Sequence, residues 1–301
     1  MGGVVGTLPP SVIRSMAKQY AAGATVDDAM RVVGELRDAG INSTVAVLGE
    51  AATTEGYADQ HMRELESVFD ALRKAGRSDL DVRLGIKPTA LGIDVSNELA
   101  TKNLIAIASN AQDAGRIVEV DMEQLQYVDR TLDMVRSAKL SSYSNVYAVV
   151  QAYLHRTNND VEQLIRDGIP ARIVKGTYKE PLKAFQLYES VRENFVALVR
   201  QYLEAGVFVG IATHDEYVIV RALNMIRELG VDPANYEFQM IMGVQETLRQ
   251  SLVDAGHPVR ATVHFGSDLH LWSIRRLKEN PEIARYAVSG MADAVRHRKA
   301  N

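Results

Sequence analysis

The sequence predicts an α/β fold, specifically a distorted (βα)8 barrel of the TIM type with extra helices at its N-terminus. Short apolar segments rich in β-branched residues alternate with amphipathic segments of helical periodicity, and glycines recur where the amphipathic segments end. Near-continuous apolar strands that alternate with helices indicate a parallel sheet covered by helices. Eight such units favour closure into a barrel, and a doubly wound open sheet is the main alternative.

The recurring glycines mark the expected helix ends. Each closes an amphipathic stretch, and most are followed by a short β-branched run. Glycine just after a helix adopts the left-handed conformation at little steric cost. The glycines in this position are Gly40, Gly76, Gly115, Gly206, Gly230 and Gly256. Near the N-terminus, Thr25 is the expected N-cap of a helix, with Asp28 three residues further on.

The eight expected strands are distributed over one domain. They are Thr44–Leu48, Val82–Ile86, Ile117–Val120, Val146–Leu154, Ala171–Val174, Val207–Ile211, Tyr236–Ile241 and Val259–Val263. No linker rich in Pro, Gly or Ser divides the chain. We therefore expect N-terminal helices over residues 1–40 and the barrel over residues 41–301.

Composition limits the classes of function. The hydrophobic content of 47% and charged content of 24% are typical of a soluble globular protein. A net charge of −4 does not indicate a nucleic-acid-binding surface. The absence of cysteine excludes disulfides, thiolate metal sites and cysteine nucleophiles, and it fits a reducing cytoplasm.

The termini and the longest apolar runs bear on membrane association. Residues 1–10 lack the pattern of a signal peptide, and no apolar run approaches the ~20 residues that span a bilayer. The basic segment Arg296–Lys299 would give only weak attraction to anionic lipid. We expect a cytoplasmic protein, with peripheral contact at the inner face of the membrane as a further hypothesis.

Polar residues gather where the expected strands end, which is where barrel enzymes carry their chemistry. Such residues are costly to bury without a partner or a ligand. They are Lys87, Asp121, Glu123, Gln151, Arg172, Lys175, His214, Asp215, Glu237 and Gln239, followed by Arg275 and Arg276 on the helix after the last strand.

The segments around these residues resemble the motifs of the proline dehydrogenase family, in the same order along the chain. They are Leu84–Thr89 (LGIKPT), Val120–Glu123 (VDME), Val150–Leu154 (VQAYL), Arg172–Tyr178 (RIVKGTY), Ala212–Asp215 (ATHD), Tyr236–Gln239 (YEFQ) and Arg275–Glu279 (RRLKE). The resemblance extends from about Ile41 to Pro281. One such motif is weak, whereas seven in series on successive strands are specific.

The resemblance implies a barrel that holds FAD noncovalently and oxidises L-proline or a proline analogue to the pyrroline. A hydride passes to the flavin, and a quinone or other acceptor then reoxidises it. The implied catalytic residues are Lys87, Asp121, Arg275 and Arg276. The implied substrate contacts are Lys87, Thr177, Tyr178, Ile241, Thr262, Arg275 and Arg276. The implied cofactor contacts are Asp121, Gln151, Arg172, Val174, Gly176, Thr213, His214, Gln239 and Glu279.

The chemistry of the side chains agrees with these roles. Two adjacent guanidiniums, those of Arg275 and Arg276, offer an amino-acid carboxylate bidentate donors that a lone lysine cannot offer. An arginine near the N5 and N1 edge of a flavin would favour the negative charge that reduction creates. Gly176 would permit close approach of the backbone to a flat cofactor.

Three positions depart from the family pattern near the expected substrate. Thr262 stands where the family has a tyrosine that packs on the proline ring, His264 replaces a proline and Thr177 replaces an alanine. Losing an aromatic contact costs about 0.5–1.5 kcal/mol beyond buried area. A substrate with an extra polar group would recover part of that, so a substituted ring such as hydroxyproline is the alternative substrate.

Two other functions compete with this interpretation. Asp121, Glu123, His214 and Asp215 would suit a barrel metallohydrolase, but the sequence has no His-x-His pair and too few converging ligands. We therefore expect no metal. The altered Thr177 and Thr262 would suit a barrel that has lost catalysis, but buried charges without function are costly.

Overall fold

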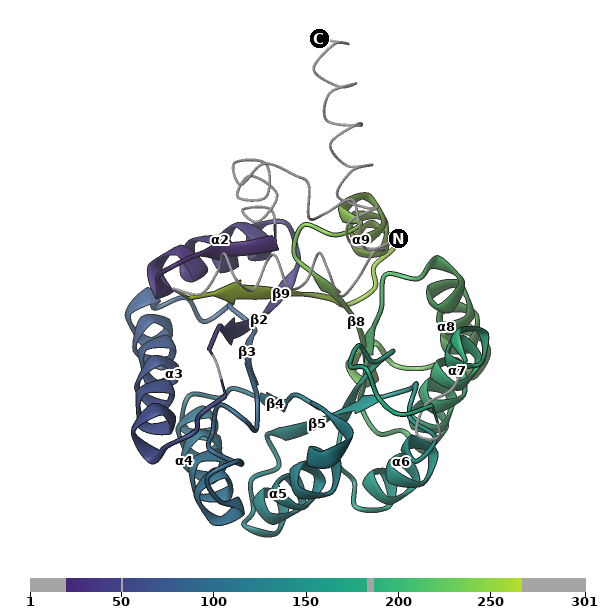
Figure 1. Cartoon of the computed structure of the whole chain (residues 1–301). Helices are drawn as coiled ribbons and strands as arrows, with labels where there is room; N and C mark the ends of the chain where they lie inside the picture. The colour runs from purple at the N-terminus through teal and green to yellow at the C-terminus, as the bar shows by residue number, and fades with distance from the viewer. Residues whose placement is uncertain (1–19, 50, 183–186, 267–301) are drawn as a thin grey trace, which may run out of the picture.

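The barrel is built from parallel strands joined by outer helices (Figure 1). The computed structural model describes residues 20–49, 51–182 and 187–266. The strands are β1 (Ala21–Gly23), β2 (Asn42–Val47), β3 (Val82–Ile86), β4 (Val118–Val120), β5 (Val146–Gln151), β6 (Ala171–Val174), β7 (Val209–Ala212), β8 (Tyr236–Ile241) and β9 (Val259–Phe265).

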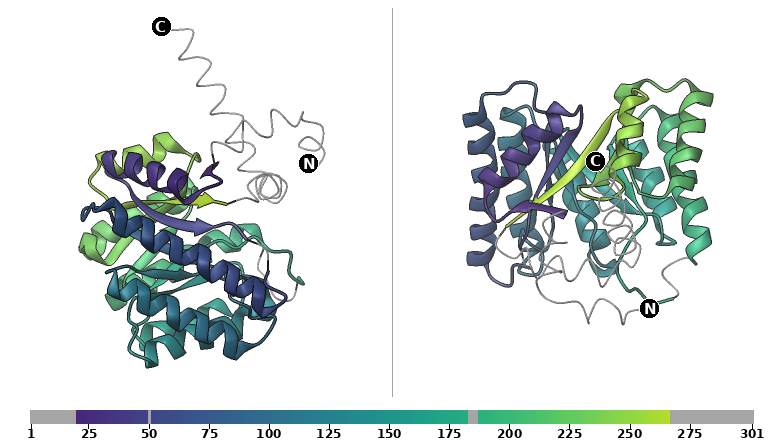
Figure 2. Two further views of the ribbon diagram at one scale, coloured as in Figure 1. Left: turned by 90° about the vertical axis from the view of Figure 1, so that its left-hand side faces the viewer. Right: turned by 90° about the horizontal axis from the view of Figure 1, so that it is seen from above.

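Helices follow the strands around the ring. They are α2 (Val26–Asp38), α3 (Glu55–Ala75), α4 (Asn97–Asp113), α5 (Val128–Leu140), α6 (Thr157–Arg166), α7 (Tyr188–Ala205), α8 (Glu216–Leu229) and α9 (Glu246–Asp254). Two short 3-10 turns, η2 (Leu125–Tyr127) and η3 (Pro233–Asn235), precede α5 and β8. Both side views in Figure 2 show the helices outside the strands.

Strand pairing closes the sheet. β2 to β8 pair in sequence order, and β9 pairs in parallel with both β8 and β2. A doubly wound open sheet would leave two free edges, so this pairing excludes it. The predicted eight-stranded α/β barrel is confirmed.

The segment before the first barrel strand is not wholly helical. β1 lies within it and pairs with β9 through Ala21 and His264. α2 follows, and its capping box is confirmed: the Thr25 side chain accepts from the backbone N–H of Asp28, whose side chain accepts from the backbone N–H of Thr25. The sequence signal for β1 is weak because the strand has only three residues.

All six predicted helix-ending glycines have φ between 59° and 82°, in the left-handed region. The strand boundaries are less accurate. The predicted strand Val146–Leu154 stops at Gln151, because residues 152–155 turn toward α6. β7 begins at Val209 rather than at Val207, and β9 continues to Phe265, where it pairs with both β1 and β2.

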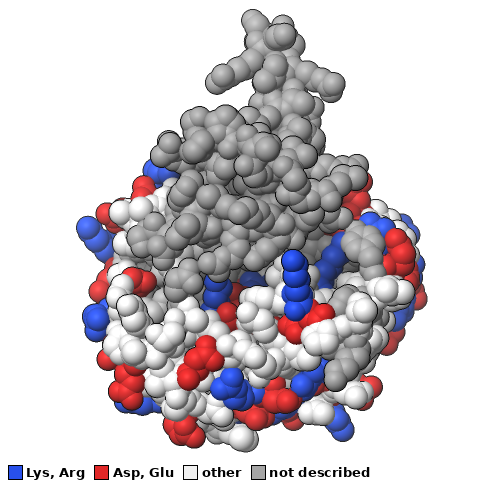
Figure 3. Space-filling view, viewed as in Figure 1, with Lys and Arg blue, Asp and Glu red and all other residues white. Residues whose placement is uncertain are grey.

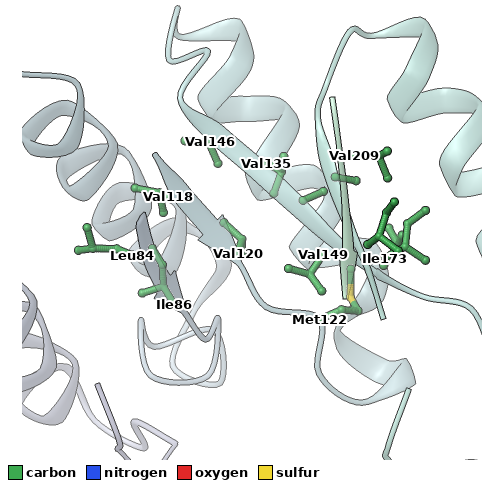
Figure 4. Packing of buried hydrophobic residues seen from close by; sticks show 14 of the residues in the cluster. Leu84, Ile86, Val118, Val120, Met122, Val135, Val146, Val149, Ile173 and Val209 are labelled. Atoms are coloured by element: carbon green, nitrogen blue, oxygen red, sulfur yellow. The ribbon is translucent and has the colours of Figure 1, made fainter. Parts of the chain in front are cut away.

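The apolar core lies between the barrel and the helices (Figure 4). Leu84 and Ile86 of β3 and Val118 and Val120 of β4 are almost fully buried there. Charged side chains instead cover the outer helices, with acidic and basic residues interspersed (Figure 3). Within the described part of the chain, no helix has the length and apolar character needed to cross a membrane.

Candidate active site in the barrel

The alternation of side chains along a strand places every second residue inside the barrel. The inward set contains Arg83 of β3, Glu119 of β4, Arg172 of β6, Glu237 of β8 and Arg260 of β9, all buried. Their hydrogen bonds join strands that are not neighbours in the sheet, or reach past a neighbouring strand, which confirms that they point inward. The interior is therefore filled by paired charges at its amino-terminal and middle levels.

Glu119 lies at the centre of this network and is 0% exposed. Its Oε1 accepts from Arg83 Nη1 at 3.0 Å and from Gln239 Nε2 at 2.8 Å. Its Oε2 accepts from Thr44 Oγ1 and Arg172 Nη1, both at 3.1 Å. Four donors from four strands thus saturate one carboxylate.

The lower end of the network is held by Arg260, which is also 0% exposed. Its Nε donates to Glu237 Oε1 at 2.8 Å, and its Nη1 donates to the carbonyl of Ser43 at 2.6 Å. Its Nη2 donates to the Asp81 carboxylate at 2.9 Å, at the base of the barrel. Arg83 also pairs with Glu237, at 3.1 Å.

Mutual pairing keeps these groups charged. Burial would raise the pKa of Glu119, but the guanidiniums of Arg172, Arg83 and Arg260 outweigh burial and lower it to about 2. Burial would lower the pKa of Arg172, but the carboxylates of Glu119 and Asp121 raise it overall. Both groups are therefore ionised at neutral pH.

Two inward positions have no side chain. A Cβ on Gly210 of β7 would lie 2.6 Å from Gln239 Nε2, and a Cβ on Gly85 of β3 would lie 3.3 Å from Thr44 Cγ2. These glycines make room for the polar side chains of Gln239 and Thr44 on the neighbouring strands. Their role was not predicted from the sequence.

The carboxyl-terminal mouth differs from the base. Lys87, Val174, Ile241 and Thr262 occupy inward positions and are only partly buried. The residues predicted from the ends of β3, β6, β8 and β9 therefore lie at the same end of the barrel interior. In Figure 3, basic and acidic side chains lie beside one another near the centre of this face.

The Asp121 carboxylate pairs with an arginine inside the barrel. It accepts from Arg172 Nη2, while the Asp121 backbone N–H donates to the carbonyl of Ile86, the residue before Lys87. Arg172 lies on β6, two strands from β4. Its guanidinium reaches across the interior to both Glu119 and Asp121. Glu123 also lies near Lys87, whose charge offsets part of the rise in the Glu123 pKa that burial causes.

Glu123 anchors the loop that follows Lys87. Its two carboxylate oxygens accept from the backbone N–H and the hydroxyl of Thr89, both at 2.9 Å. Its pKa is nevertheless raised, because burial outweighs these hydrogen bonds. The loop carrying Lys87 is thereby tied to the end of β4.

Two glutamines present unpartnered acceptors. Gln151 Nε2 donates to the carbonyl of Met122 at 3.1 Å, and Gln239 Nε2 donates to Glu119 and Glu237. The Oε1 atoms of both glutamines, and Nε of Arg172, are buried and have no hydrogen-bond partner among the residues that the structure describes. Buried polar atoms without partners are rare and often mark a ligand site.

The β7 motif provides a neutral histidine and a buried carboxylate. His214 Nε2 accepts from the backbone N–H of Ile241 at 2.9 Å. Burial, with Arg249 and Lys175 nearby, lowers the pKa of His214 to about 4, so the ring is neutral at pH 7. Asp215 pairs with Lys175 and Arg192, each at 2.6 Å, and Thr213 Oγ1 accepts from the Asp215 N–H.

Packing within the protein also requires glycine at position 176. A Cβ there would lie 2.1 Å from Cδ1 of Tyr153, and φ is +109°, a backbone conformation that other residues rarely adopt. The expected approach of this backbone to a flat cofactor stays a prediction. Beyond Gly176, Thr177 is exposed and Tyr178 is partly buried.

Three predicted site residues, Arg275, Arg276 and Glu279, lie outside the described residues, as does the basic segment Arg296–Lys299. Among the residues that the structure describes, no group of three His, Asp or Glu side chains is placed to hold a metal ion. Sequence reasoning also missed Glu119. Its signal was available, since it lies two residues before Asp121 and so shares its inward face.

Comparison with known proteins adds a family to this geometry. The family described as "Proline dehydrogenase" matches residues 29–287. "Proline dehydrogenase 1" of Bacillus subtilis subsp. natto is 32% identical over 277 residues, which span 91% of this chain and 90% of that protein. "Proline dehydrogenase" of Deinococcus radiodurans is 30% identical over 282 residues, 92% of this chain and 90% of that protein.

Solved structures share the fold. Proline utilization A (PutA) from Bdellovibrio bacteriovorus, inactivated by N-propargylglycine, matches with a TM-score of 0.82 at 23% identity. The match covers 89% of this chain and 33% of that one. PutA from Corynebacterium freiburgense matches with a TM-score of 0.76 at 19% identity, over 96% of this chain and 33% of that one.

Proposed function

This chain belongs to the proline dehydrogenase family, and from that membership we propose that it oxidises the ring C–N bond of L-proline, with FAD as the hydride acceptor. The family is one of flavin-dependent oxidoreductases, so the chain is an enzyme rather than a scaffold. The product would be the pyrroline imine.

The observation that best supports FAD binding is the set of unpartnered polar atoms at the barrel mouth. The acceptors Gln151 Oε1 and Gln239 Oε1 and the donor Arg172 Nε are buried and unsatisfied. A flavin ring offers both N–H donors and carbonyl or nitrogen acceptors, so these residues fit it. When bound, the flavin would accept two electrons from the substrate.

The apolar side chains beside these polar atoms fit a flat ring. Val174 and Ile241 are partly buried on inward positions at the ends of β6 and β8. The guanidinium of Arg172, held by two carboxylates, would favour the negative charge that a flavin gains on reduction. Thr213, His214 and Gly176 would contribute further cofactor contacts, as would Glu279, which lies outside the described residues.

The candidate cation for binding the substrate is Lys87, which is partly buried on an inward position at the mouth of the barrel. We propose that it acts on the amine or carboxylate of the amino acid, together with Arg275 and Arg276. The amine must be uncharged for hydride transfer, and a nearby ammonium disfavours the protonated amine electrostatically. Thr177 and Tyr178, on the segment after β6, would complete the substrate contacts.

A substituted substrate is the second candidate, and the position of Thr262 favours it. Thr262 is partly buried and stands beside Ile241 and Thr44 in the strand register. A hydroxyl at this inward position could hydrogen-bond a ring substituent such as that of 4-hydroxyproline.

The reoxidation of the flavin would use a quinone, and the protein would be cytoplasmic with peripheral contact at the inner membrane face. The family membership supports an electron acceptor of this kind. The basic segment Arg296–Lys299 would supply a weak attraction to anionic lipid.

Anaerobic flavin reduction against a panel of cyclic amino acids tests the proposal. The purified protein is expected to be yellow, and its flavin band should bleach with L-proline. Faster bleaching by 4-hydroxyproline would favour the second candidate, and a colourless protein that does not take up FAD would refute the flavin assignment. A Lys87→Met variant should retain FAD but be reduced more slowly; reduction at the parental rate would remove Lys87 from the mechanism.

A further inference from the structure

The geometry points to Glu119 as a positioning residue for the cofactor, one that fixes the side chains of Arg172 and Gln239. The inference rests on the proposed function, because that function places these two side chains against the flavin. Glu119 itself is fully buried below the mouth and would not touch the cofactor.

The first support is that one carboxylate holds both side chains. Oε2 accepts from Arg172 Nη1 at 3.1 Å, while Oε1 accepts from Gln239 Nε2 at 2.8 Å. Arg172 comes from β6 and Gln239 from β8, with β7 between them. Both side chains can reach the same carboxylate because Gly210 of β7, paired in register with Arg172, has no side chain that would stand between them.

The second support is that two carboxylates determine the orientation of the Gln239 amide. Its Nε2 donates to Glu119 at 2.8 Å and to Glu237 at 2.9 Å. An ionised carboxylate only accepts hydrogen bonds, so the reversed amide would place its oxygen against two anions. Gln239 must therefore present Oε1, an acceptor, to whatever binds above it.

The third support concerns Arg172. Its Nη1 donates to Glu119 and its Nη2 to Asp121, while its Nε has no partner within the described part of the chain. Two carboxylates at separate nitrogens fix the plane of the guanidinium more firmly than one would. Without Glu119, the side chain would keep its charge and its Asp121 contact but would lose this fixed plane.

Two variants separate positioning from simple charge. Glu119→Asp keeps the negative charge but shortens the side chain, so it cannot reach all four donors. Glu119→Gln removes the charge and introduces donors against Arg83, Arg172 and Gln239. If Glu119 acts by positioning, both variants leave Arg172 poorly placed and lower the flavin midpoint potential.

The size and sign of the shift are the decisive measurement. We expect each variant to disfavour the reduced flavin about tenfold, which is about 30 mV for a two-electron couple. If Glu119 acted only through its charge, Glu119→Gln would raise the potential and Glu119→Asp would leave it unchanged. Either of those results overturns the inference.

Asp81→Asn is the matched control, since Asp81 belongs to the same network through Arg260 but does not contact Arg172 or Gln239. Its potential should equal the parental value. Thermal unfolding of the FAD-free proteins follows folding independently. A folded Glu119→Asp chain that no longer binds FAD supports the inference, whereas global unfolding of both Glu119 variants overturns it, because Glu119 would then serve the fold alone. A parental protein that binds no FAD refutes the proposed function instead.

Discussion

The base and the mouth of the barrel interior use the same kinds of side chain differently. At the base, Arg260 has an acceptor for each of its three nitrogens and is wholly buried. At the mouth, Lys87 and Thr262 are partly exposed, and the Oε1 acceptors of Gln151 and Gln239 have no partner in residues 20–49, 51–182 and 187–266. The base is complete by itself, whereas the mouth has hydrogen-bonding capacity left for a ligand.

This difference shows how a polar barrel interior separates stability from binding. Charges are costly to bury, and only a closed network offsets that cost. Glu119 belongs to both levels, because it pairs with Arg83 below and with Arg172 above. One carboxylate therefore connects the charges at the base with the side chains at the mouth.

The strongest test of the comparison is to break the base. Arg260→Ala would leave Glu237 with one fewer cation in a buried site, at a cost of about 3–5 kcal/mol in the free energy of unfolding. Denaturant unfolding measures it. Arg200→Ala, which removes exposed ion pairs with Glu204 and Glu228, is the control and should cost no more than about 1 kcal/mol. Equal effects would show that the base network does not stabilise the fold.

A methyl group added on β7, between the base and the mouth, should reduce stability less than the loss of Arg260 does. Gly210→Ala places a Cβ 2.6 Å from Gln239 Nε2 and so displaces that amide. We expect a loss of about 1–3 kcal/mol in stability, together with weaker FAD binding. Gly85→Ala is the matched control, because its closest side-chain contact is a longer 3.3 Å. If the Gly85 variant lost FAD and the Gly210 variant did not, the importance of Gln239 would be contradicted.

His214, at the mouth, makes the free energy of unfolding depend on pH. Its pKa falls from 6.5 to about 4 in the folded chain, so the unfolded chain binds a proton at a higher pH than the folded chain does. The stability contributed by the neutral ring is present above pH 6.5 and is lost as pH falls toward 4. His214→Asn should remove about 3 kcal/mol of that pH dependence, because each unit of pKa shift corresponds to about 1.4 kcal/mol. Unfolding curves at several pH values measure it, and parallel curves for both proteins would contradict the assignment.

The smallest effect on stability is expected in the outer helix α2, away from both the base and the mouth of the barrel. Gly34 lies inside α2, and a Cβ there would lie 3.6 Å from Arg77 Nη1, an ordinary contact. Gly34→Ala should stabilise the fold by about 0.5–1 kcal/mol, because alanine favours the helix. FAD affinity and flavin reduction should stay unchanged. A loss of stability, measured by denaturant unfolding, would show that α2 is packed more tightly than these contacts indicate.

Local patterns predicted much of the barrel. The left-handed glycines and the Thr25 cap were correct because such signals depend on neighbouring residues alone. Strand ends were less accurate, since β9 continues to Phe265 only because β1 and β2 provide partners. The three-residue β1 was missed for the same reason. Partners distant in sequence decide where a strand stops.

The sequence by itself determined the fold class, the family resemblance and the helix ends, because these follow from periodicity and local motifs. Only the tertiary structure decided the pairing of the buried charges: that Asp121 pairs with Arg172, that Gly176 makes room for Tyr153, and that Glu119 joins β4 to β6 and β8. Electrostatic pairing depends on distances across a closed barrel. Those distances are set by the closed barrel, in which β9 pairs with β2.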